Sequence, residues 1–342
     1  MPTPPRRRRA LPITREPVPG GDGFIYRLHG RRVTSRRELE RIAGMVIPPA
    51  WTQVEICRSP ASEVQARGID AAGRTQMIYH PAYRRRRERE KFARALRFSE
   101  ALPRLRARID RDLRGRRLSR ERVTAAVLRL IDTELFRVGN AEYARRYHSY
   151  GITTLRAEHV RVGSEAVTFN FVGKSGMRQV RRVQDPRLAR LIRRLLELPG
   201  DEVFCYVDDT GVHRLTSAHV NEAVRRYAGE EFTAKDFRTW GATRYAAARA
   251  LEFAPADLST PRRRRAAARA IVQQTALRLG NTPAVTRSSY IDPRVFHALE
   301  RPERLEAVRT LRARLRPRRT ASVEEQSAQA LLRGVSGEPS PG

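Results

Sequence analysis

The spacing of apolar residues changes along this chain from a two-residue repeat to a helical one. Between residues 24 and 80, apolar and polar residues alternate in short runs such as Trp51–Ile56 and Thr75–His80. Alternation with a period of two is typical of half-buried strands. A short helix is expected to interrupt this pattern over about residues 35–43. The segment 21–85 is therefore predicted to be a small antiparallel, β-rich domain.

Beyond residue 85, apolar residues recur mostly at helical spacing. The segment 120–137, for example, has an apolar stripe on one face and predicts a helix that ends before Gly139. A period of two returns between residues 159 and 183, where two turns separate three runs, and Lys174 lies in the second turn. The segment 86–316 is predicted to be mostly α-helical with one three-stranded antiparallel sheet. The expected fold class is α+β.

The two ends of the chain differ in composition from the rest. Residues 1–20 are rich in Pro and Arg, and residues 317–342 are rich in Ser, Glu and Gly. Such segments lack the apolar residues that a folded core requires, so both are predicted to be disordered tails. The chain has no apolar run that fits a signal peptide or a membrane span. A cytoplasmic, nucleoid-associated protein without membrane contact is expected.

The charge of the chain narrows the class of partner. The 342 residues include 69 basic and 37 acidic residues, which gives a net charge of +32. A field of this size attracts a polyanion, and nucleic acid is the leading candidate. Two distant cysteines and seven histidines without ligand spacing predict neither a disulfide nor a metal site. No phosphate-binding GxxxxGK[ST] motif is present. We therefore expect no metal and no cofactor.

Only three of the 69 basic residues are lysine: Lys91, Lys174 and Lys235. A guanidinium group stays protonated above pH ~12, whereas an ammonium group can shift its pKa and release a proton. A lysine retained in such an arginine-rich chain is therefore a candidate proton donor. Lys91 lies among alternating Arg and Glu residues and has the character of a surface position. Lys174 and Lys235 are the stronger candidates.

An enzyme that cuts a DNA strand without metal needs a nucleophile, cations for the phosphate and an acid for the leaving oxygen. Arginine suits the second role, because its planar fork matches two phosphate oxygens. Taken singly, each candidate residue also fits an ordinary structural position, such as a helix cap or a core tyrosine. Their order within one predicted domain is more informative: Arg137, Lys174, Lys235, Arg238, Asn281, Tyr290.

Six segments in this order make the chain resemble the type IB DNA topoisomerases, in particular the bacterial branch close to the poxvirus enzymes. The resemblance covers about residues 24–300. The segments that carry it are Ile47–Trp51, Arg137–Asn140, Phe171–Gly176, Phe232–Gly241, Leu279–Pro283 and Ser289–Pro293.

The resemblance implies roles for five residues. Tyr290 resembles the nucleophile that becomes joined to the 3′-phosphate of DNA. Arg137 and Arg238 resemble the transition-state clamps, and Lys174 resembles the general acid for the 5′-oxygen. Many relatives have His where this chain has Asn281, and an amide can only donate a hydrogen bond to a phosphate oxygen at that position.

The resemblance also implies contacts with DNA. Lys235 resembles a residue that contacts the phosphate or a groove edge, and Tyr143 resembles a phosphate-contacting tyrosine. Gln76 and Tyr79 resemble residues of the small domain that contact DNA bases and backbone in the groove. Ordinary packing in strands or helices remains the alternative for each of them. Many relatives have an aromatic residue where this chain has Met77, so sequence preference is expected to differ.

The expected reaction is relaxation of supercoiled duplex DNA by reversible cutting of one strand through a 3′-phosphotyrosyl intermediate. Neither ATP nor metal is required, and the expected protein is a monomer without an obligatory protein partner. A site-specific tyrosine recombinase or integrase is the alternative, because it uses the same residues in the same order. A non-catalytic architectural DNA-binding protein would explain the charge but not the ordered residues.

Overall fold

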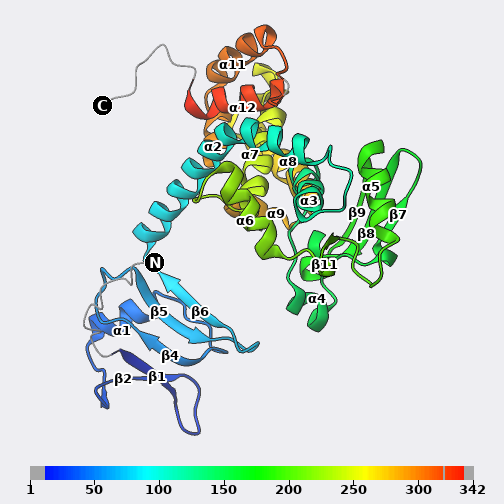
Figure 1. Ribbon diagram of the computed structural model, residues 1–342. Coiled ribbons are helices and arrows are strands. Elements are labelled where there is room, and N and C mark those ends of the chain that lie inside the picture. The colour runs from blue at the N-terminus through cyan, green and yellow to red at the C-terminus, as the bar shows by residue number, and fades with distance from the viewer. Residues whose placement is uncertain (1–11, 319, 335–342) are drawn as a thin grey trace. The chain divides into compact units, whose positions relative to one another are not determined.

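A computed structural model describes residues 12–318 and 320–334 (Figure 1). The chain divides after Lys91 into two compact units, each with its own core. The architecture is mixed α+β, with a β-rich first unit and a mostly helical second unit that contains a three-stranded sheet. This confirms the predicted fold class.

The first unit is built on a six-stranded antiparallel sheet with strand order β3-β2-β1-β4-β5-β6. The short helix α1 (Arg36–Ala43) buries Ile42 in the core of this unit, together with Ile13, Val54, Ile56 and Ala66. The strands are β1 (Ile13–Pro17), β2 (Phe24–Leu28), β3 (Arg31–Arg32), β4 (Thr52–Ile56), β5 (Val64–Ile69) and β6 (Thr75–Tyr79).

Strand β1 corrects the prediction that residues 1–20 form a disordered tail. It pairs with both β2 and β4, and Ile13 is fully buried. The guanidinium of Arg15 donates to the carbonyls of Pro48 at 3.1 Å and Trp51 at 2.5 Å. One apolar side chain and one well-bonded arginine thus order a segment whose composition indicated disorder. Residues 1–11 lie outside the described part of the chain.

The second unit contains most of the helices. Its sheet is the predicted three-stranded meander, with β8 between β7 and β9. A two-stranded hairpin of β10 and β11 was not predicted. The elements from α2 onward, which begins in the first unit, are α2 (Pro81–Asp112), α3 (Arg120–Glu134), α4 (Ala141–Tyr147), β7 (Val160–Val162), β8 (Ala166–Val172), β9 (Arg178–Gln184), α5 (Pro186–Leu196), β10 (Cys205–Asp208), β11 (Gly211–Arg214), α6 (Ser217–Ala228), α7 (Ala234–Ala250), α8 (Pro261–Leu279), α9 (Pro283–Ser289), α10 (Pro293–Leu299), α11 (Pro302–Arg314) and α12 (Val323–Arg333).

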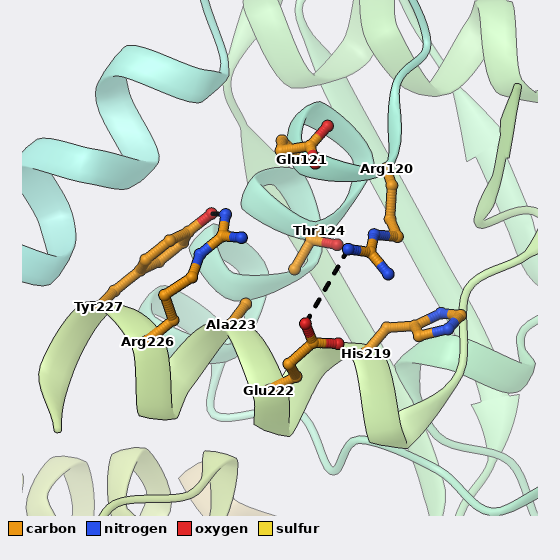
Figure 2. A pocket seen from close by; sticks show the side chains of 8 residues that line it. All are labelled: Arg120, Glu121, Thr124, His219, Glu222, Ala223, Arg226 and Tyr227. Atoms are coloured by element: carbon orange, nitrogen blue, oxygen red, sulfur yellow. Dashed lines mark hydrogen bonds and ion pairs between the residues drawn. The ribbon is translucent and has the colours of Figure 1, made fainter. Parts of the chain in front are cut away.

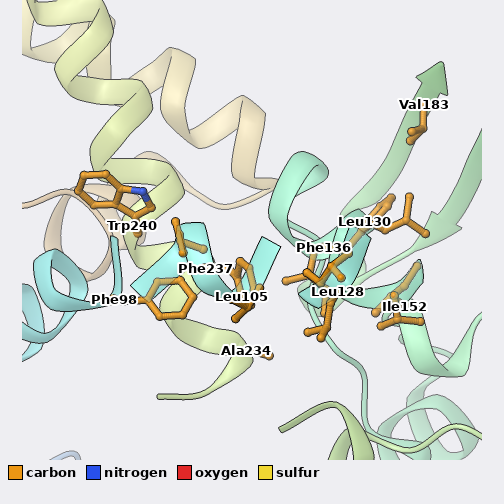
Figure 3. Packing of buried hydrophobic residues seen from close by; sticks show 14 of the residues in the cluster. Phe98, Leu105, Leu128, Leu130, Phe136, Ile152, Val183, Ala234, Phe237 and Trp240 are labelled. Carbon is orange, nitrogen blue, oxygen red and sulfur yellow. The ribbon is translucent and has the colours of Figure 1, made fainter. Parts of the chain in front are cut away.

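The core of the second unit fixes the backbone beside two of the predicted site residues (Figure 3). Phe237 packs edge-on against Phe98 of α2, with ring centroids 4.9 Å apart. Phe136 packs in the same way against Phe169 of β8 at 5.2 Å. Each of Phe136 and Phe237 directly precedes an arginine of the candidate site. Burial of the phenylalanine therefore holds the backbone from which the arginine side chain extends.

Helix α3 ends earlier than predicted. Its last residue is Glu134, and Leu135 adopts a left-handed conformation with φ of 57°. Leu135 is nevertheless buried, since its side chain packs with Ala242 and Leu279. The three residues that follow α3, which the sequence pattern placed in the helix, instead turn the chain toward the candidate site.

Helix α12 corrects the prediction that residues 317–342 form a disordered tail. It buries Ala328, Leu331 and Leu332 in the core of the second unit, and Ser322 caps its first turn. Residues 319 and 335–342 lie outside the described part of the chain.

Glu325 of α12 is 3% exposed and forms the centre of a charged cluster. It accepts two hydrogen bonds of 2.7 Å from Arg106 of α2, and Arg106 also pairs with Asp132 at 2.7 Å. Arg244 of α7 lies 3.5 Å from the same carboxylate. The cluster therefore ties α12 to three other helices. Burial raises the pKa of Glu325, but hydrogen bonds and charge from Arg106 and Arg244 outweigh it and lower the pKa overall.

Replacing Glu325 with Ala should destabilise the protein by about 3 kcal/mol, because it removes one of the two carboxylates that pair with the buried Arg106 guanidinium and the carboxylate nearest Arg244. Urea unfolding at neutral pH measures this change. Glu324→Ala, an exposed neighbour in the same turn, is the matched control and should leave the midpoint unchanged. Since the pKa of Glu325 is lowered by folding, its contribution should be lost as the pH falls below 4.5, the ordinary pKa of glutamate. Equal unfolding midpoints for the two variants would contradict this account.

Candidate active site

Helix α7 positions Arg238 near its first turn. The carboxylate of Asp236 accepts hydrogen bonds from the backbone N–H of Thr233 at 2.9 Å and from Nε of Arg94 at 3.0 Å. These bonds fix the start of the helix, where backbone N–H groups otherwise lack partners. Arg238 lies within the following turn and is 4% exposed. Its guanidinium is therefore buried in the second unit.

The Arg238 guanidinium is held by backbone carbonyls from two other segments. It donates to the carbonyl of Leu135 and, at 3.0 Å, to that of Leu279 at the end of α8. Gly241, one turn further along α7, permits this packing, because a Cβ there would lie 2.3 Å from Cδ2 of Leu135. A glycine in a helix interior is unfavourable by about 1 kcal/mol relative to alanine. Here it allows the chain after α3 to approach Arg238.

Arg137 reaches the same place from the segment after α3. Its backbone carbonyl accepts from the N–H of Ile152 at 2.8 Å, which holds the main chain. Its guanidinium donates to the carbonyl of Gly280 at 3.3 Å and to Oδ1 of Asn281. Arg238 also donates to Oδ1 of Asn281, at 3.4 Å. The Asn281 amide thus links the two arginines.

Two buried donors of this cluster have no hydrogen-bond partner among the described residues: Nδ2 of Asn281 and Nε of Arg238. An unpaired buried donor costs about 1–3 kcal/mol. Donors of this kind are suited to an anion, since an anionic oxygen accepts from both. The orientation of Asn281, with Oδ1 toward the arginines, leaves its amide N–H groups available for such an acceptor.

Tyr290 joins the cluster at the end of α9. Its carbonyl accepts from the hydroxyl of Thr243 at 3.0 Å, and its ring packs with Leu135, Ala242 and Leu279. Cζ of Arg238 lies 5.4 Å from the centroid of the Tyr290 ring. The phenol is therefore partly buried beside a fixed guanidinium.

The electrostatics of the cluster favour a phenolate. Burial raises the pKa of Tyr290, but the charge and hydrogen bonding of Arg238 and the charges of Arg137 and Lys235 together lower it below its ordinary value. Burial also lowers the pKa of Arg137 and of Arg238, and in Arg238 the repulsion from Arg137 adds to the effect. Two crowded guanidinium groups are stabilised by a nearby negative charge, either a phenolate or a phosphate.

The two lysines singled out by the sequence lie at the surface. Lys235 is exposed in the first turn of α7, three residues before Arg238. Lys174 is exposed in the turn between β8 and β9, where Ser175 has a φ of 63°. No hydrogen bond or ion pair joins Lys174 to Arg137, Arg238, Asn281 or Tyr290 among the described contacts. The structure thus brings four of the five predicted catalytic residues into direct contact and places Lys174 on an adjacent hairpin.

The other predicted DNA contacts are distributed over both units. Tyr143 is exposed on α4, with its ring 5.5 Å from that of Tyr147. In the first unit, the Tyr79 hydroxyl donates to the sulfur of Met77 at 3.3 Å, whereas the Gln76 amide donates to Asp70 at 2.9 Å. Because side chains alternate along a strand, Gln76 and Tyr79 lie on opposite faces of β6. Tyr79 and Met77 share the more exposed face.

Sequence reasoning missed several residues that support the cluster. Thr243 bridges α7 and the tyrosine segment, because its hydroxyl also accepts from the N–H of Asp292 at 3.1 Å. Gln179 and Arg181 of β9 contact the end of α8 and the residue after it. The sequence did not single out Arg181, because arginine is common throughout this chain. Thr243 lies about one and a half helical turns after Arg238. Its role depends on contacts between α7 and the Tyr290 segment, which the sequence does not show.

A separate pocket lies between α3 and α6 (Figure 2). Its polar groups are used within the protein: Arg226 donates to the Tyr227 hydroxyl at 3.0 Å, and that hydroxyl donates to Asp112 at 3.0 Å. The ring of His219 accepts from the N–H of Thr216 at 3.3 Å. None of the predicted site residues lines this pocket. Its polar side chains Arg226, Tyr227 and His219 are bonded to neighbouring protein groups, as expected where two helices pack together.

Two general features of the described residues bear on the class of protein. No group of three or more His, Cys, Asp or Glu side chains is arranged to hold a metal ion. None of the described helices combines the length and hydropathy that a membrane crossing requires.

Comparison with known proteins agrees with this arrangement. Residues 80–313 match the model of the eukaryotic DNA topoisomerase I catalytic core, and residues 23–70 match the N-terminal domain of bacterial DNA topoisomerase IB. DNA topoisomerase 1B of Acanthamoeba polyphaga mimivirus is 35% identical over 286 residues, which cover 79% of this chain and 83% of that protein. DNA topoisomerase 1B of Vaccinia virus (strain Copenhagen) is 23% identical over 270 residues, which cover 77% and 82%.

Among solved structures, the XerH site-specific recombinase bound to its difH substrate is 15% identical with a TM-score of 0.36, and the match covers 59% of this chain and 52% of that one. A likeness of this size carries no functional conclusion. The sequence matches, in contrast, show that the chain is similar to DNA topoisomerases over most of its length. The chain belongs to the type IB DNA topoisomerase family, as its resemblance implied, and is an enzyme of that class.

Proposed function

We propose that this enzyme relaxes supercoiled duplex DNA by two successive transesterifications at Tyr290. The observation that supports it most is the contact of the Tyr290 ring with Arg238, which shares the Asn281 amide with Arg137. In the first step, the Tyr290 oxygen attacks phosphorus and the bond from phosphorus to the 5′-oxygen breaks. In the second step, the freed 5′-hydroxyl attacks the 3′-phosphotyrosine and releases the tyrosine.

Each residue of the cluster has a distinct role in this proposal. Arg137 and Arg238 stabilise the charge that develops on the phosphate in the transition state, and their fixed positions lower the reorganisation needed. The unpaired Nδ2 of Asn281 donates to a non-bridging oxygen, since an amide does not titrate near neutral pH. Lys174 donates the proton that the leaving 5′-oxygen requires.

The reaction needs neither ATP nor a metal ion in this proposal. The energy of the phosphodiester bond is kept in the phosphotyrosine while the cut strand swivels, so resealing requires no external energy. The arginine pair supplies the positive charge that a metal ion supplies in metal-dependent nucleases, and the lysine supplies the proton.

The substrate in this proposal is double-stranded DNA, and residues of both units contact it. The β-rich first unit contributes Gln76 and Tyr79, and the mostly helical second unit contributes Tyr143 and Lys235. The exposed positions of Tyr79, Tyr143 and Lys235 are compatible with such contacts. The enzyme acts as a monomer without an obligatory protein partner, in the nucleoid of the cytoplasm.

Relaxation of a negatively supercoiled plasmid in the presence of EDTA and the absence of ATP tests the proposal. Purified protein should produce a ladder of topoisomers ending in relaxed circles, without a specific site in the plasmid. Sedimentation under the same conditions should show a monomer. Plasmid binding without relaxation would favour an architectural protein. A requirement for paired cognate sites would favour a recombinase.

DNA affinity should fall steeply with salt, because each neutralised phosphate releases a condensed counterion. The slope of log K against log [salt] is about −0.9 for each phosphate contact in duplex DNA. With the net charge of +32, several contacts are expected, so the slope should be steeper than about −3. Fluorescence anisotropy with a short duplex at four salt concentrations measures it. An affinity independent of salt would contradict a basic DNA clamp.

A further inference from the structure

Gln179 and Arg181 of β9 contact the segment that leads into Asn281, one of the residues of the candidate site. Gln179 and Arg181 follow the Lys174 turn and share the inner face of the sheet, since alternate residues of a strand point the same way. Gln179 is 6% exposed. Burying an amide is unfavourable unless its groups are bonded. The contacts of both side chains lead to the residues just before Asn281.

Arg181 closes the end of α8. One nitrogen of its guanidinium donates to the carbonyls of Leu277 at 3.3 Å and Arg278 at 3.0 Å, and to Oε1 of Gln179 at 3.3 Å. The last carbonyls of a helix lack backbone partners and carry partial negative charge, so a cation there is favourable. Gly280 and Asn281 directly follow these carbonyls. Arg181 therefore helps to fix where the Asn281 segment leaves the helix.

Gln179 packs directly against Gly280. A Cβ at position 280 would lie 2.3 Å from both Nε2 and Oε1 of Gln179, and Gly280 has a φ of 60°. Only glycine combines this backbone conformation with so close an approach. Nε2 of Gln179 donates to the carbonyl of Met177 at 3.3 Å, within the turn that carries Lys174. The carbonyl of Gly280 accepts from Arg137 at 3.3 Å.

We propose that Gln179 and Arg181 are positioning residues for the transesterification site. They hold the Gly280–Asn281 segment against β9, so that the Asn281 amide stays between the two clamp arginines. The inference rests on the proposed function, because it assigns the pair an effect on strand cleavage. Neither side chain forms a hydrogen bond or ion pair with Tyr290, Arg137 or Arg238 among the described contacts. Their loss should therefore slow cleavage without a matching loss of DNA affinity.

The variants Arg181→Ala and Gln179→Met test this role. Methionine keeps the length of glutamine but removes both polar groups. Arg182→Ala is the matched control, because Arg182 is the next residue, carries the same charge and lies exposed on the opposite face of β9. Single-turnover formation of the covalent adduct on a suicide oligonucleotide gives the cleavage rate, and anisotropy at the same salt gives the affinity. Denaturant midpoints confirm that each variant is folded.

The cleavage rates of Arg181→Ala and Gln179→Met should fall by about 10- to 100-fold, the size expected for a displacement of about 1 Å at a reacting group. Their DNA affinities should equal that of Arg182→Ala, which should cleave at the wild-type rate. Arg181→Lys should recover part of the rate, since it restores the positive charge at the helix end. Cleavage by Arg181→Ala and Gln179→Met at the rate of the control would overturn the proposal.

Hydrogen exchange of the backbone over residues 279–282 separates failure of this inference from failure of the proposed function. Exchange there should be faster in Arg181→Ala and Gln179→Met than in wild type and in Arg182→Ala. If wild-type protein forms no adduct, the proposed function fails. Faster exchange in Arg181→Ala and Gln179→Met would still show that these side chains hold the Gly280–Asn281 segment. If wild type cleaves normally and exchange is the same in all variants, Gln179 and Arg181 do not hold this segment and the inference is wrong.

Discussion

Replacing Tyr290 with Phe should abolish plasmid relaxation and the covalent protein–DNA adduct while DNA binding is retained. The change removes only the oxygen that attacks phosphorus. The ring keeps its packing against Leu135, Ala242 and Leu279, so the fold should not change. Agarose gels measure relaxation, and denaturation with SDS followed by electrophoresis detects the adduct.

Tyr245→Phe is the matched control, because Tyr245 is also a partly buried tyrosine of the catalytic unit, in α7, and lies outside the cluster. It should relax plasmid DNA at the wild-type rate. A covalent adduct formed by Tyr290→Phe would show that another residue is the nucleophile. Lost DNA binding in that variant would show that the hydroxyl has a structural role instead.

The lowered pKa of Tyr290 gives this prediction a physical basis. A phenol with an ordinary pKa of ~10 is a weak nucleophile at neutral pH, and activation requires either a base or nearby positive charge. The described contacts supply charge, from Arg238 first and then from Arg137 and Lys235. Because burial opposes ionisation, the arginine pair must outweigh it. Nucleophile activation and phosphate binding thus depend on the same two side chains.

The regular part of the fold could be predicted from the sequence. The alternation between residues 159 and 183 is strong, because one face of the three-stranded sheet is buried and the other is exposed. The helices of the second unit follow from periodic apolar residues in the same way. Patterns of this kind record burial along one element, so they predict elements well and contacts between elements poorly.

The parts that were missed depend on contacts between distant segments. Residues 13–17 are ordered by Ile13 and Arg15, and a single buried isoleucine among Arg and Pro residues gives no periodic signal. Helix α12 had a readable start, since Ser322 and Glu325 form a capping box. The Ser-, Glu- and Gly-rich composition of residues 317–342 nevertheless led to the prediction of a disordered tail. Glu325 is stabilised by Arg106, 219 residues earlier in the chain, which no local pattern can show.

The candidate site shows the same division. Motif order placed Arg137, Arg238, Asn281 and Tyr290 in one site, and the structure joins them through hydrogen bonds and ring contact. The order could not show that Asn281 presents its oxygen to the arginines and leaves its nitrogen unpaired. Asn281 takes this orientation because Arg137 and Arg238 can only donate hydrogen bonds, and Oδ1 is the only acceptor atom of the amide.

Replacing Lys174 with Ala should slow strand cleavage by about 10²–10⁴-fold, the usual contribution of a general acid. The 5′-oxygen of DNA leaves as a poor, strongly basic alkoxide unless it receives a proton. A substrate with sulfur in place of that oxygen leaves readily as a thiolate, so it should restore most of the rate of the variant. Single-turnover cleavage of matched 5′-oxygen and 5′-thio substrates measures both effects.

Lys174→Arg distinguishes proton donation from positive charge alone. A guanidinium keeps the charge at the hairpin tip but does not release its proton, since its pKa exceeds ~12. This variant should therefore be nearly as slow as Lys174→Ala on the ordinary substrate and should also be rescued by sulfur. Lys91→Ala, which removes the lysine outside the proposed site, should cleave both substrates as wild type does. Normal cleavage by Lys174→Arg would mean that Lys174 acts through its charge, and a slow variant without rescue would mean that it positions the DNA. Because Lys174 lies exposed on a hairpin adjacent to the arginine cluster, donation of a proton requires the bound DNA to bring the 5′-oxygen to the hairpin tip.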